Sequence, residues 1–332
     1  MHTVALLLAG GTGTRLYPAS RSHRPKQFQS FLDDEGRSLL RQAADRAAVA
    51  DDLYVVTREA YAEDVREHVP EAAVLTEPAG KDTGPALVYA AHRIREQVGD
   101  CTILNLPSDH RVAGDFATTA RQALRVAHET GRLVTIGVEP DRPATGYGYV
   151  EPGATHVEWA ELAAFHEKPD EETAREYVAA GHLWNAGMFA WTPDALLDEA
   201  RDSPLEPVVA ACEDGAPERG FREVDSLSID YAVMERTDHA AVVPADFEWS
   251  DLGSWDAFAR LSDGENTTVG DVETLEIDAS GNVLAGDAGH VSVVGVDDLV
   301  VASYDDRVLA APVEEAQRVR EVVAELREEG KF

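Results

Sequence analysis

The sequence predicts an α/β fold, in which a mostly parallel sheet flanked by helices is followed by a small β-rich C-terminal domain closed by a helix. Over the first 140 residues, short apolar runs alternate with stretches whose apolar residues have helical spacing. This alternation is typical of parallel sheets with helices on both faces. After about residue 263, short β-runs are separated by Gly, Asp and Asn, and a charged amphipathic stretch over 312–329 follows.

The elements are expected in a regular order along the first domain. Strands are predicted over 4–9, 53–57, 73–77, 102–107 and 133–138. Helices are predicted over 38–49, 59–68, 83–97, 115–130 and 171–180, with a further helical region over 193–237. Asp82 or Thr83 is expected to cap the helix over 83–97, with Pro85 in its first turn. The change of pattern predicts two domains, over 1–262 and 263–332.

Composition limits the classes of function. The net charge is −33, with acidic residues spread along the chain, which disfavours nucleic acid and anionic membranes as partners. No apolar stretch approaches the ~20 residues of a membrane span, and the first strand follows no basic segment, so we expect a cytoplasmic protein. The acidity and the presence of only four lysines suggest a halophilic protein. Cys101 and Cys212 lack ligand spacing and are expected to be inert buried thiols.

A glycine loop follows the first strand as GGTGTRLYP, with Lys26 further along. Glycine allows backbone N–H groups to approach phosphate oxygens. Leu16 replaces the third glycine of a dinucleotide fingerprint, and the Gly-Lys-Ser/Thr of a P-loop is absent. The glycines alone would also fit a plain strand-to-helix turn. Arg15 and Lys26 favour phosphate binding, because both side chains are partners of polyphosphate.

Further segments place polar residues where ligands bind. EPAGKDTGPAL (77–87) leads into a helix whose N-terminus is either offered to a ligand or simply capped. Asp109 in LPSDH follows a central strand, where a carboxylate either binds Mg²⁺ or caps a turn. Asn185 in WNAGMF is a structural bridge or a ligand contact. Asp251 in WSDLGSW is either a ligand-binding carboxylate or the capping acid of a core loop. The segment SIDYAVMER (228–236) is expected to be a packing helix.

Together with TGYGYVE (145–151) and FHEKP (165–169), these segments resemble the sugar-nucleotide pyrophosphorylases. The form SR-x3-PKQF is closest to the guanylyltransferases of that family. The resemblance implies a Rossmann-like nucleotidyltransferase fold of GT-A type with a left-handed β-helix-like C-terminal domain. It implies transfer of GMP from GTP to mannose 1-phosphate, giving GDP-mannose and pyrophosphate, and a homodimer. Two alternatives are glucose 1-phosphate with UTP or dTTP, and a non-catalytic regulatory homologue that binds sugar nucleotide.

The resemblance also implies roles for individual residues. Arg15, Lys26, Asp109 and Asp251 would be catalytic, and the two aspartates would bind Mg²⁺. The implied nucleotide-binding residues are Leu8, Ala9, Gly10, Gly11, Gly13, Thr14, Pro78, Asp82, Thr83, Pro85 and Ser108. The implied sugar-phosphate-binding residues are Gly146, Tyr147, Glu167, Lys168 and Asn185. Asp109 and Asp251 are far apart in the sequence, so only the fold can bring them together.

Overall fold

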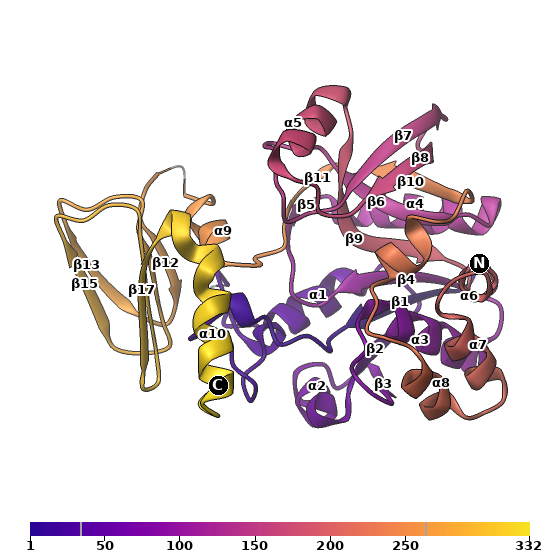
Figure 1. Ribbon diagram of the computed structural model, residues 1–332, viewed down its shortest axis with the longest axis horizontal. Helices are drawn as coiled ribbons and strands as arrows, with labels where there is room; N and C mark the ends of the chain where they lie inside the picture. Colours follow the sequence, from indigo (N-terminus) through magenta and orange to yellow (C-terminus); the bar gives the residue numbers. More distant parts are fainter. Residues whose placement is uncertain (34, 263) are drawn as a thin grey trace. The chain divides into compact units, whose positions relative to one another are not determined.

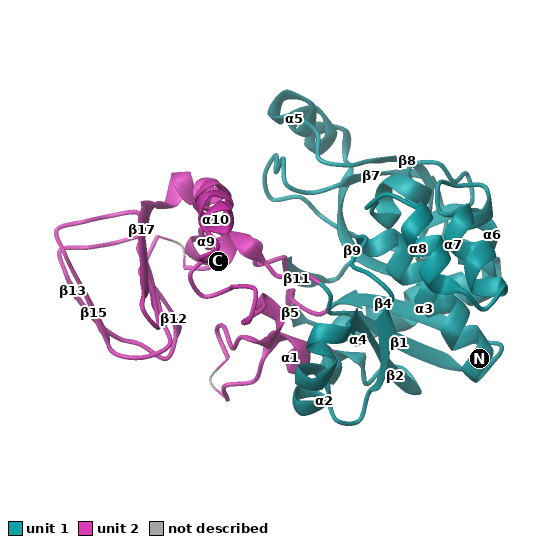
Figure 2. Ribbon diagram, turned by 60° about the horizontal axis from the view of Figure 1, so that its bottom comes forward, with its two compact units in different colours: residues 1–10, 44–107, 112–249 teal, residues 11–43, 108–111, 250–332 magenta. Residues whose placement is uncertain are grey.

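The computed structural model describes residues 1–33, 35–262 and 264–332, which form two compact units. Unit 1 comprises residues 1–10, 44–107 and 112–249, and unit 2 comprises residues 11–43, 108–111 and 250–332 (Figure 2). Both units are therefore built from separate stretches of the chain. The division into domains over 1–262 and 263–332 stays a prediction, and its boundary residue Asp263 lies outside the described residues.

Unit 1 is organised around a nine-stranded sheet of order β3-β2-β1-β4-β9-β6-β10-β8-β7 (Figure 1). Strands β8 and β9 run against the direction of the others, so the sheet is mixed but mostly parallel, as predicted. Two shorter strands, β5 and β11, pair with each other. The strands of these two sheets are β1 (Thr3–Leu8), β2 (Asp52–Arg58), β3 (Ala73–Glu77), β4 (Thr102–Pro107), β5 (Arg111–Gly114), β6 (Leu133–Val138), β7 (Tyr149–Thr155), β8 (Ala160–His166), β9 (Leu183–Trp191), β10 (Ala240–Pro244) and β11 (Phe247–Ser250).

Helices follow most of the strands, as the alternation predicts. They are α1 (Leu39–Ala47), α2 (Ala62–His68), α3 (Thr83–Val98), α4 (Phe116–Thr130), α5 (Glu171–Ala180), α6 (Pro193–Arg201), α7 (Glu206–Glu213) and α8 (Pro217–Glu223). Asp82 caps α3 and Asp115 caps α4, each with a side-chain oxygen accepting a backbone N–H. Helices α3, α6 and α7 pack together, and their buried apolar faces join those of the strands in one core.

Unit 2 contains the predicted β-rich domain. Strands β12 (Thr267–Gly270), β14 (Val283–Gly286), β16 (Leu299–Tyr304) and β17 (Arg307–Pro312) form one sheet, and β13 (Glu273–Ile277) and β15 (His290–Val294) form another. Consecutive strands from β12 to β16 alternate between the two sheets, which gives the chain a solenoid course. Helices α9 (Trp255–Ala259) and α10 (Val319–Glu328) belong to the same unit. The helix predicted from residue 312 begins later, because residues 313–318 form a tighter 3₁₀ segment.

The core of unit 2 includes residues from both ends of the chain. Leu16, Tyr17 and Phe31 of the N-terminal loop region pack with Trp255 and with apolar residues of β12, β14 and β16. The Trp255 indole N–H also donates to the Tyr17 carbonyl, at 2.9 Å. The glycine loop is therefore anchored on the residues that follow Asp251 and on the C-terminal strands.

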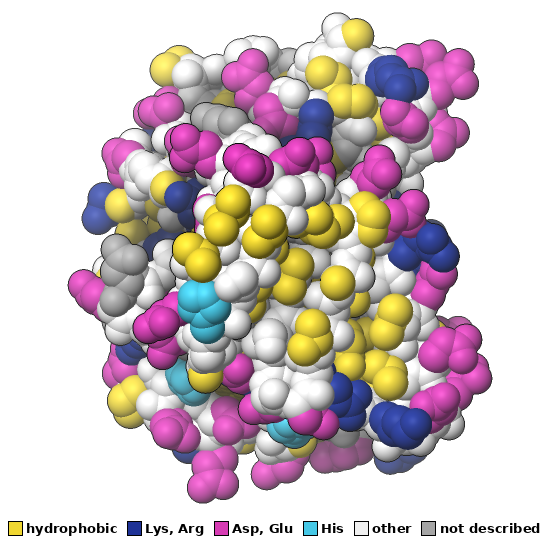
Figure 3. Space-filling view, turned by 90° about the vertical axis from the view of Figure 1, so that its left-hand side faces the viewer, with side chains coloured by type: hydrophobic (Ala, Val, Ile, Leu, Met, Phe, Trp, Pro, Cys, Tyr) yellow, Lys and Arg dark blue, Asp and Glu magenta, His cyan; other side chains and the backbone are white. Residues whose placement is uncertain are grey.

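One outer face of the β-rich part carries exposed apolar side chains. Leu275 and Ile277 of β13 and Val294 of β15 are exposed. Figure 3 shows hydrophobic side chains gathered on this side, with acidic side chains around them. The homodimer expected from the family resemblance stays a prediction.

Both cysteines are buried and unpaired, and burial raises the pKa of each thiol to about 11. They therefore match the expected inert thiols. In a search of the described residues, no helix proved long and apolar enough to cross a membrane.

Candidate active site

Gly13 brings the glycine loop of unit 2 close to Lys26. Its φ of 64° lies in the left-handed region, and a Cβ placed on it would come within 2.5 Å of the Lys26 Cβ. Glycine is thus required both by the backbone conformation and by the close approach. The Lys26 side chain is only 3% exposed.

Lys26 joins two segments that are distant in sequence. Its ammonium donates to Asp109 Oδ2 at 3.0 Å and to the Asp251 carbonyl at 2.5 Å. His110 lies beside the same carboxylate, with Nε2 3.8 Å from Asp109 Oδ1. The fold therefore brings together the lysine and both aspartates that the sequence motifs single out.

The Asp251 carboxylate is held by the turn that follows it. Asp251 Oδ1 accepts the Gly253 N–H at 3.0 Å, and a Cβ on Gly253 would lie 2.3 Å from Asp251 Oδ2. Between them, Leu252 adopts a φ of 43°, which is unfavourable for a leucine. Burial of the Leu252 side chain in the unit 2 core holds this conformation. The turn thus fixes the direction of the carboxylate.

These residues surround a pocket of about 330 Å³ within unit 2. Its lining residues are Gly13, Thr14, Arg15, Lys26, Asp109, His110, Asp251 and Gly253. Gly11 and Ser108, which were also predicted to bind nucleotide, belong to unit 2 but do not line this pocket. The pocket therefore combines a cationic wall with two carboxylates.

Arg15 is positioned by the C-terminal part of the chain. Its Nη1 donates to Gln317 Oε1 at 3.4 Å. Gln317 Nε2 in turn donates to Ser254 Oγ at 2.6 Å and to Asp256 Oδ1 at 3.0 Å. One amide thus links Arg15 to the segment that follows Asp251.

The electrostatics of the pocket keep Asp109 ionised. Burial alone would raise the pKa of Asp109, but the Lys26 ammonium and then His110 outweigh it and lower that pKa. Two carboxylates that line one pocket form an oxygen-rich donor set, which suits a hard cation such as Mg²⁺. The residues present therefore fit the predicted metal.

In unit 1, the end of β1 is fixed by its neighbours. The Ala9 N–H donates to the Val56 carbonyl at 2.9 Å, and Arg58 Nε donates to the Gly10 carbonyl at 2.7 Å. The Glu77 carboxylate lies against Gly10, where a Cβ would come within 3.0 Å of Oε1. Burial raises the pKa of Glu77 to about 7, against the opposing effect of Arg58. The backbone of Ala9 and Gly10, just after the last residue of β1, is thus held in place, and nucleotide binding by Leu8, Ala9 and Gly10 stays a prediction.

The start of α3 is a capped helix rather than an open one. Asp82 Oδ1 accepts the Thr83 N–H at 2.7 Å, and the Leu227 carbonyl accepts the Gly84 N–H at 3.1 Å. Pro85 has no N–H. Of the two interpretations of this N-terminus, the structure therefore shows the capped one at Thr83 and Gly84, because the protein itself satisfies these donors. Nucleotide binding by Pro78, Asp82, Thr83 and Pro85 stays a prediction.

A second polar group in unit 1 surrounds Glu167. The Glu167 carboxylate pairs with Lys168, and a Cβ on Gly148 would lie 2.4 Å from Glu167 Oε2. Lys168 has a φ of 46°, in the left-handed region that non-glycine residues rarely adopt. Gly148 is thus the glycine that makes room for the carboxylate, and sugar binding by Gly146 stays a prediction. Gly146 is exposed and has open space around it.

Asn185 is a structural bridge in this group. Its Oδ1 accepts from Thr135 Oγ1 at 2.9 Å and from the Gly187 N–H at 3.0 Å, and its Nδ2 donates to Asp230 Oδ1 at 2.9 Å. One amide hydrogen remains for a further contact. Tyr147 packs edge-on against Trp184 nearby. Sugar binding by Tyr147 and Asn185 stays a prediction.

Residues 228–236, which were expected mainly to pack, also contribute a polar contact through Asp230. Residues 230–234 form a short π-helix, a conformation common at functional sites. Burial, and then the Glu167 carboxylate, raises the pKa of Asp230 to about 6. His110, Gly148, Gly253 and Gln317 also contribute to these sites, although no role was predicted for them. His110 and the two glycines lie within motifs that the sequence shows, whereas Gln317 carries no such signal.

Comparisons with known proteins match almost the whole chain. A family model described as nucleotidyl transferase matches residues 4–267, and one described as the mannose-P isomerase/GMP-like beta-helix domain matches residues 272–326. The chain is 37% identical to the xanthan biosynthesis protein XanB of Xanthomonas campestris, over 98% of this chain and 73% of that protein. It is 36% identical to the mannose-1-phosphate guanylyltransferase ManC of Salmonella typhimurium, with the same coverage.

A solved structure is also similar along almost the whole length. It is described as mannose-1-phosphate geranyltransferase from Thermus thermophilus, and it is 34% identical with a TM-score of 0.92. The match covers 98% of this chain and 100% of that one. The mixed α/β sheet and the small β-rich C-terminal part are thus both shared with a known structure.

Proposed function

The chain belongs to the nucleotidyl transferase family, and from this premise we propose that it transfers GMP from GTP to α-D-mannose 1-phosphate, giving GDP-mannose and pyrophosphate. The names of similar proteins support this substrate pair, since relatives 35–36% identical are called mannose-1-phosphate guanylyltransferases. The observation that carries the proposal is the meeting of Lys26, Asp109 and Asp251 in one pocket beside Arg15.

The reaction is an in-line attack of a sugar phosphate oxygen on the α-phosphorus of the triphosphate. Both reactants are anions, so their repulsion must be offset before they can be aligned. In unit 2, Arg15 and Lys26 supply positive charge, and the glycine loop supplies N–H groups, at the triphosphate. The attacking oxygen is already ionised at neutral pH, so the proposal requires no general base.

Mg²⁺ bound by Asp109 and Asp251 would neutralise charge on the phosphates. In unit 1, we assign the phosphate of mannose 1-phosphate to Lys168. We assign the sugar to Gly146, Tyr147, Glu167 and Asn185, with Asp230 holding the Asn185 amide in place. The Glu167 carboxylate is buried, so its orientation is fixed before substrate binds.

A panel of nucleoside triphosphates and sugar 1-phosphates, assayed by pyrophosphate release, tests the proposal. We expect the highest kcat/KM for GTP with mannose 1-phosphate, and no release when Mg²⁺ is removed by a chelator. A preference for UTP or dTTP with glucose 1-phosphate would retain the chemistry and reject the substrates. Binding of GDP-mannose without turnover of any pair would indicate a regulatory homologue instead.

A further inference from the structure

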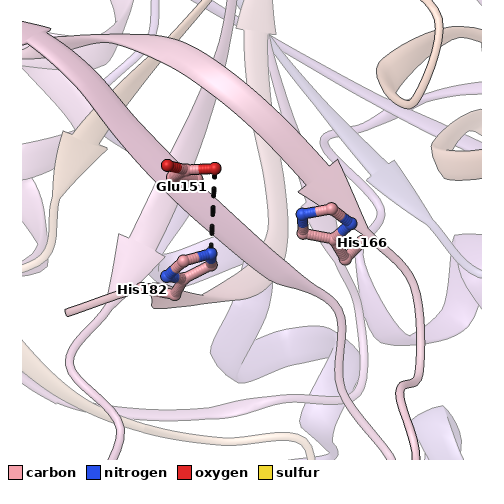
Figure 4. A group of neighbouring side chains, drawn as sticks. All are labelled: Glu151, His166 and His182. Atoms are coloured by element: carbon pink, nitrogen blue, oxygen red, sulfur yellow. Dashed lines mark ion pairs between the residues drawn. The ribbon is translucent and has the colours of Figure 1, made fainter. Parts of the chain in front are cut away.

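We propose that Glu151, His166 and His182 of unit 1 form a second metal site, which binds one first-row transition metal ion of the Zn²⁺ type (Figure 4). One ligand atom from each of the three residues lies within 4.8 Å of the others. This group is separate in sequence and in composition from the Asp109–Asp251 pair, which lies in unit 2.

The sheet itself brings the three residues together. Glu151 lies on β7, His166 ends β8, and His182 directly precedes β9. Strand β7 pairs with both of the others, since Tyr149 is opposite His166 and Val150 is opposite Leu183. The ligands therefore sit on three hydrogen-bonded neighbours, a more rigid support than a loop provides.

The spacing fits a shared ion. Glu151 Oε2 and His182 Nε2 are 3.9 Å apart. Two ligands that each lie ~2.0–2.2 Å from one ion are separated by at most ~4.0–4.4 Å, so this pair is already within the range of one ion. Figure 4 shows the Glu151 carboxylate beside the His182 ring, with the His166 ring facing the pair. Only small side-chain movements are needed to bring all three onto one ion.

His182 is buried beside Glu151. Burial lowers the pKa of His182, against the opposing effect of Glu151. The residue is 7% exposed, and its buried Nδ1 has no hydrogen-bond partner among the described residues. Nε2 is the nitrogen that faces the Glu151 carboxylate, so it is the ring atom placed to coordinate an ion shared with Glu151.

The two rings are also held in place. Tyr177 of α5 stacks on His166 with ring centroids 4.8 Å apart, and on His182 with centroids 4.6 Å apart. Stacking on a common ring limits how far either imidazole can turn. The site is thus largely formed before any ion arrives.

The donor set selects the class of ion. Two imidazoles and one carboxylate suit Zn²⁺ and its first-row neighbours, whereas Mg²⁺ and Ca²⁺ prefer oxygen ligands alone. Three protein ligands leave one position for water. Bound there, the ion would tie the end of β8 and the start of β9 to β7.

Titration of the untagged, chelator-stripped protein with Zn²⁺, in the presence of a chromophoric competitor and excess Mg²⁺, tests the site. Mg²⁺ occupies the oxygen ligands of unit 2 without competing for imidazole. We expect one equivalent of bound Zn²⁺ and a rise in Tm on binding. His166→Gln and His182→Gln should each weaken Zn²⁺ binding strongly. The loss of affinity should exceed the ~10–100-fold that is typical when a residue that only supports a metal ligand is mutated.

Two further variants make the outcome decisive. Glu151→Gln changes an exposed side chain, so it should fold normally, weaken binding and lose the rise in Tm. His92→Gln is the matched control, because His92 is also a buried histidine with an unpartnered Nδ1 and a glutamate nearby, but it belongs to no such cluster among the described residues. It should bind Zn²⁺ as the wild type does. The proposal is overturned if the wild type retains no Zn²⁺, or if Glu151→Gln and His182→Gln retain it unchanged.

Discussion

Replacing Lys26 with methionine removes one buried positive charge while leaving a side chain of similar length against Gly13. The substitution deletes the hydrogen bond to Asp109 Oδ2 at 3.0 Å and the one to the Asp251 carbonyl at 2.5 Å. The segments that carry Asp109 and Asp251 therefore lose the ammonium group that joins them. The effect on catalysis and the effect on stability can then be measured separately.

The two effects should differ in size. Loss of one preorganised donor at a site of developing charge costs about 10²–10³ in kcat. For stability, a hydrogen bond to a charged group contributes ~1.5–3 kcal/mol. Asp109 is 34% exposed, so water recovers part of this in the variant. We therefore expect a loss of about 2 kcal/mol and a Tm lower by only a few degrees.

The stability difference should depend on pH with a definite sign. Burial opposes ionisation of Asp109, and Lys26 and His110 hold its pKa below the ordinary value of 3.8. A lowered carboxyl pKa contributes stability above the ordinary pKa, and that contribution is lost as the pH falls through the folded-state value. The wild type should therefore exceed Lys26→Met in stability at neutral pH, and the two should converge in acid.

Pyrophosphate release and thermal unfolding of the same preparations measure both effects. Lys331→Met is the control, because Lys331 is exposed and pairs only with Glu329 on the surface among the described residues. It should leave rate and Tm unchanged. Near-normal turnover of Lys26→Met in a folded protein would refute the catalytic role of this lysine.

Four further outcomes are expected. Asp230→Asn should raise Tm at about pH 8 but not at about pH 4. Burial and Glu167 raise the pKa of Asp230 to about 6, so its ionised form lowers the stability of the fold above that pH. A lower Tm of the variant at about pH 8 would contradict this reasoning. Gln317→Ala should raise the KM for GTP ~3–10-fold in steady-state assays, because Arg15 loses the amide oxygen that accepts from it; an unchanged KM would argue against positioning. Gly253→Ala should lower kcat ~10²-fold, since the new Cβ displaces the Asp251 carboxylate. An unchanged kcat and an unchanged dependence on Mg²⁺ would contradict the role of this carboxylate. The urea midpoint should rise between low salt and ~1 M KCl if the surface charge is a halophilic adaptation, and a flat response would reject it.

The buried strands were the part of the fold most accessible from sequence. Strands β3, β4 and β6 have the predicted bounds, because each is an apolar run that ends at turn residues. The insertion of β9 between β4 and β6 was not predicted. Its residues are as apolar as those of its neighbours, and the pairing is set by contacts distant in sequence rather than by any local pattern.

The residues of the site likewise fall into those that sequence motifs indicate and those that only the fold reveals. Lys26, Asp109 and Asp251 stand in local motifs that indicate a chemistry, so the sequence alone is enough to single them out. Gln317 and Asp230 act through other side chains, at partners far along the chain. A glutamine in a charged helix and an aspartate in an apolar helix look ordinary in sequence. Residues that hold other residues in place therefore become visible only once the chain is folded.

The net charge of the chain and the charge of the proposed substrates have the same sign. A chain of net charge −33 repels anions as a whole, yet the proposed substrates are both anions. The conflict is resolved by distance, because exposed charges are screened beyond a Debye length of ~8–10 Å. Lys26 is buried and Arg15 lines the same pocket, so their attraction acts at contact range where screening by salt is weak. Under the proposed function, the acidic surface would therefore not prevent Lys26 and Arg15 from binding an anion at short range.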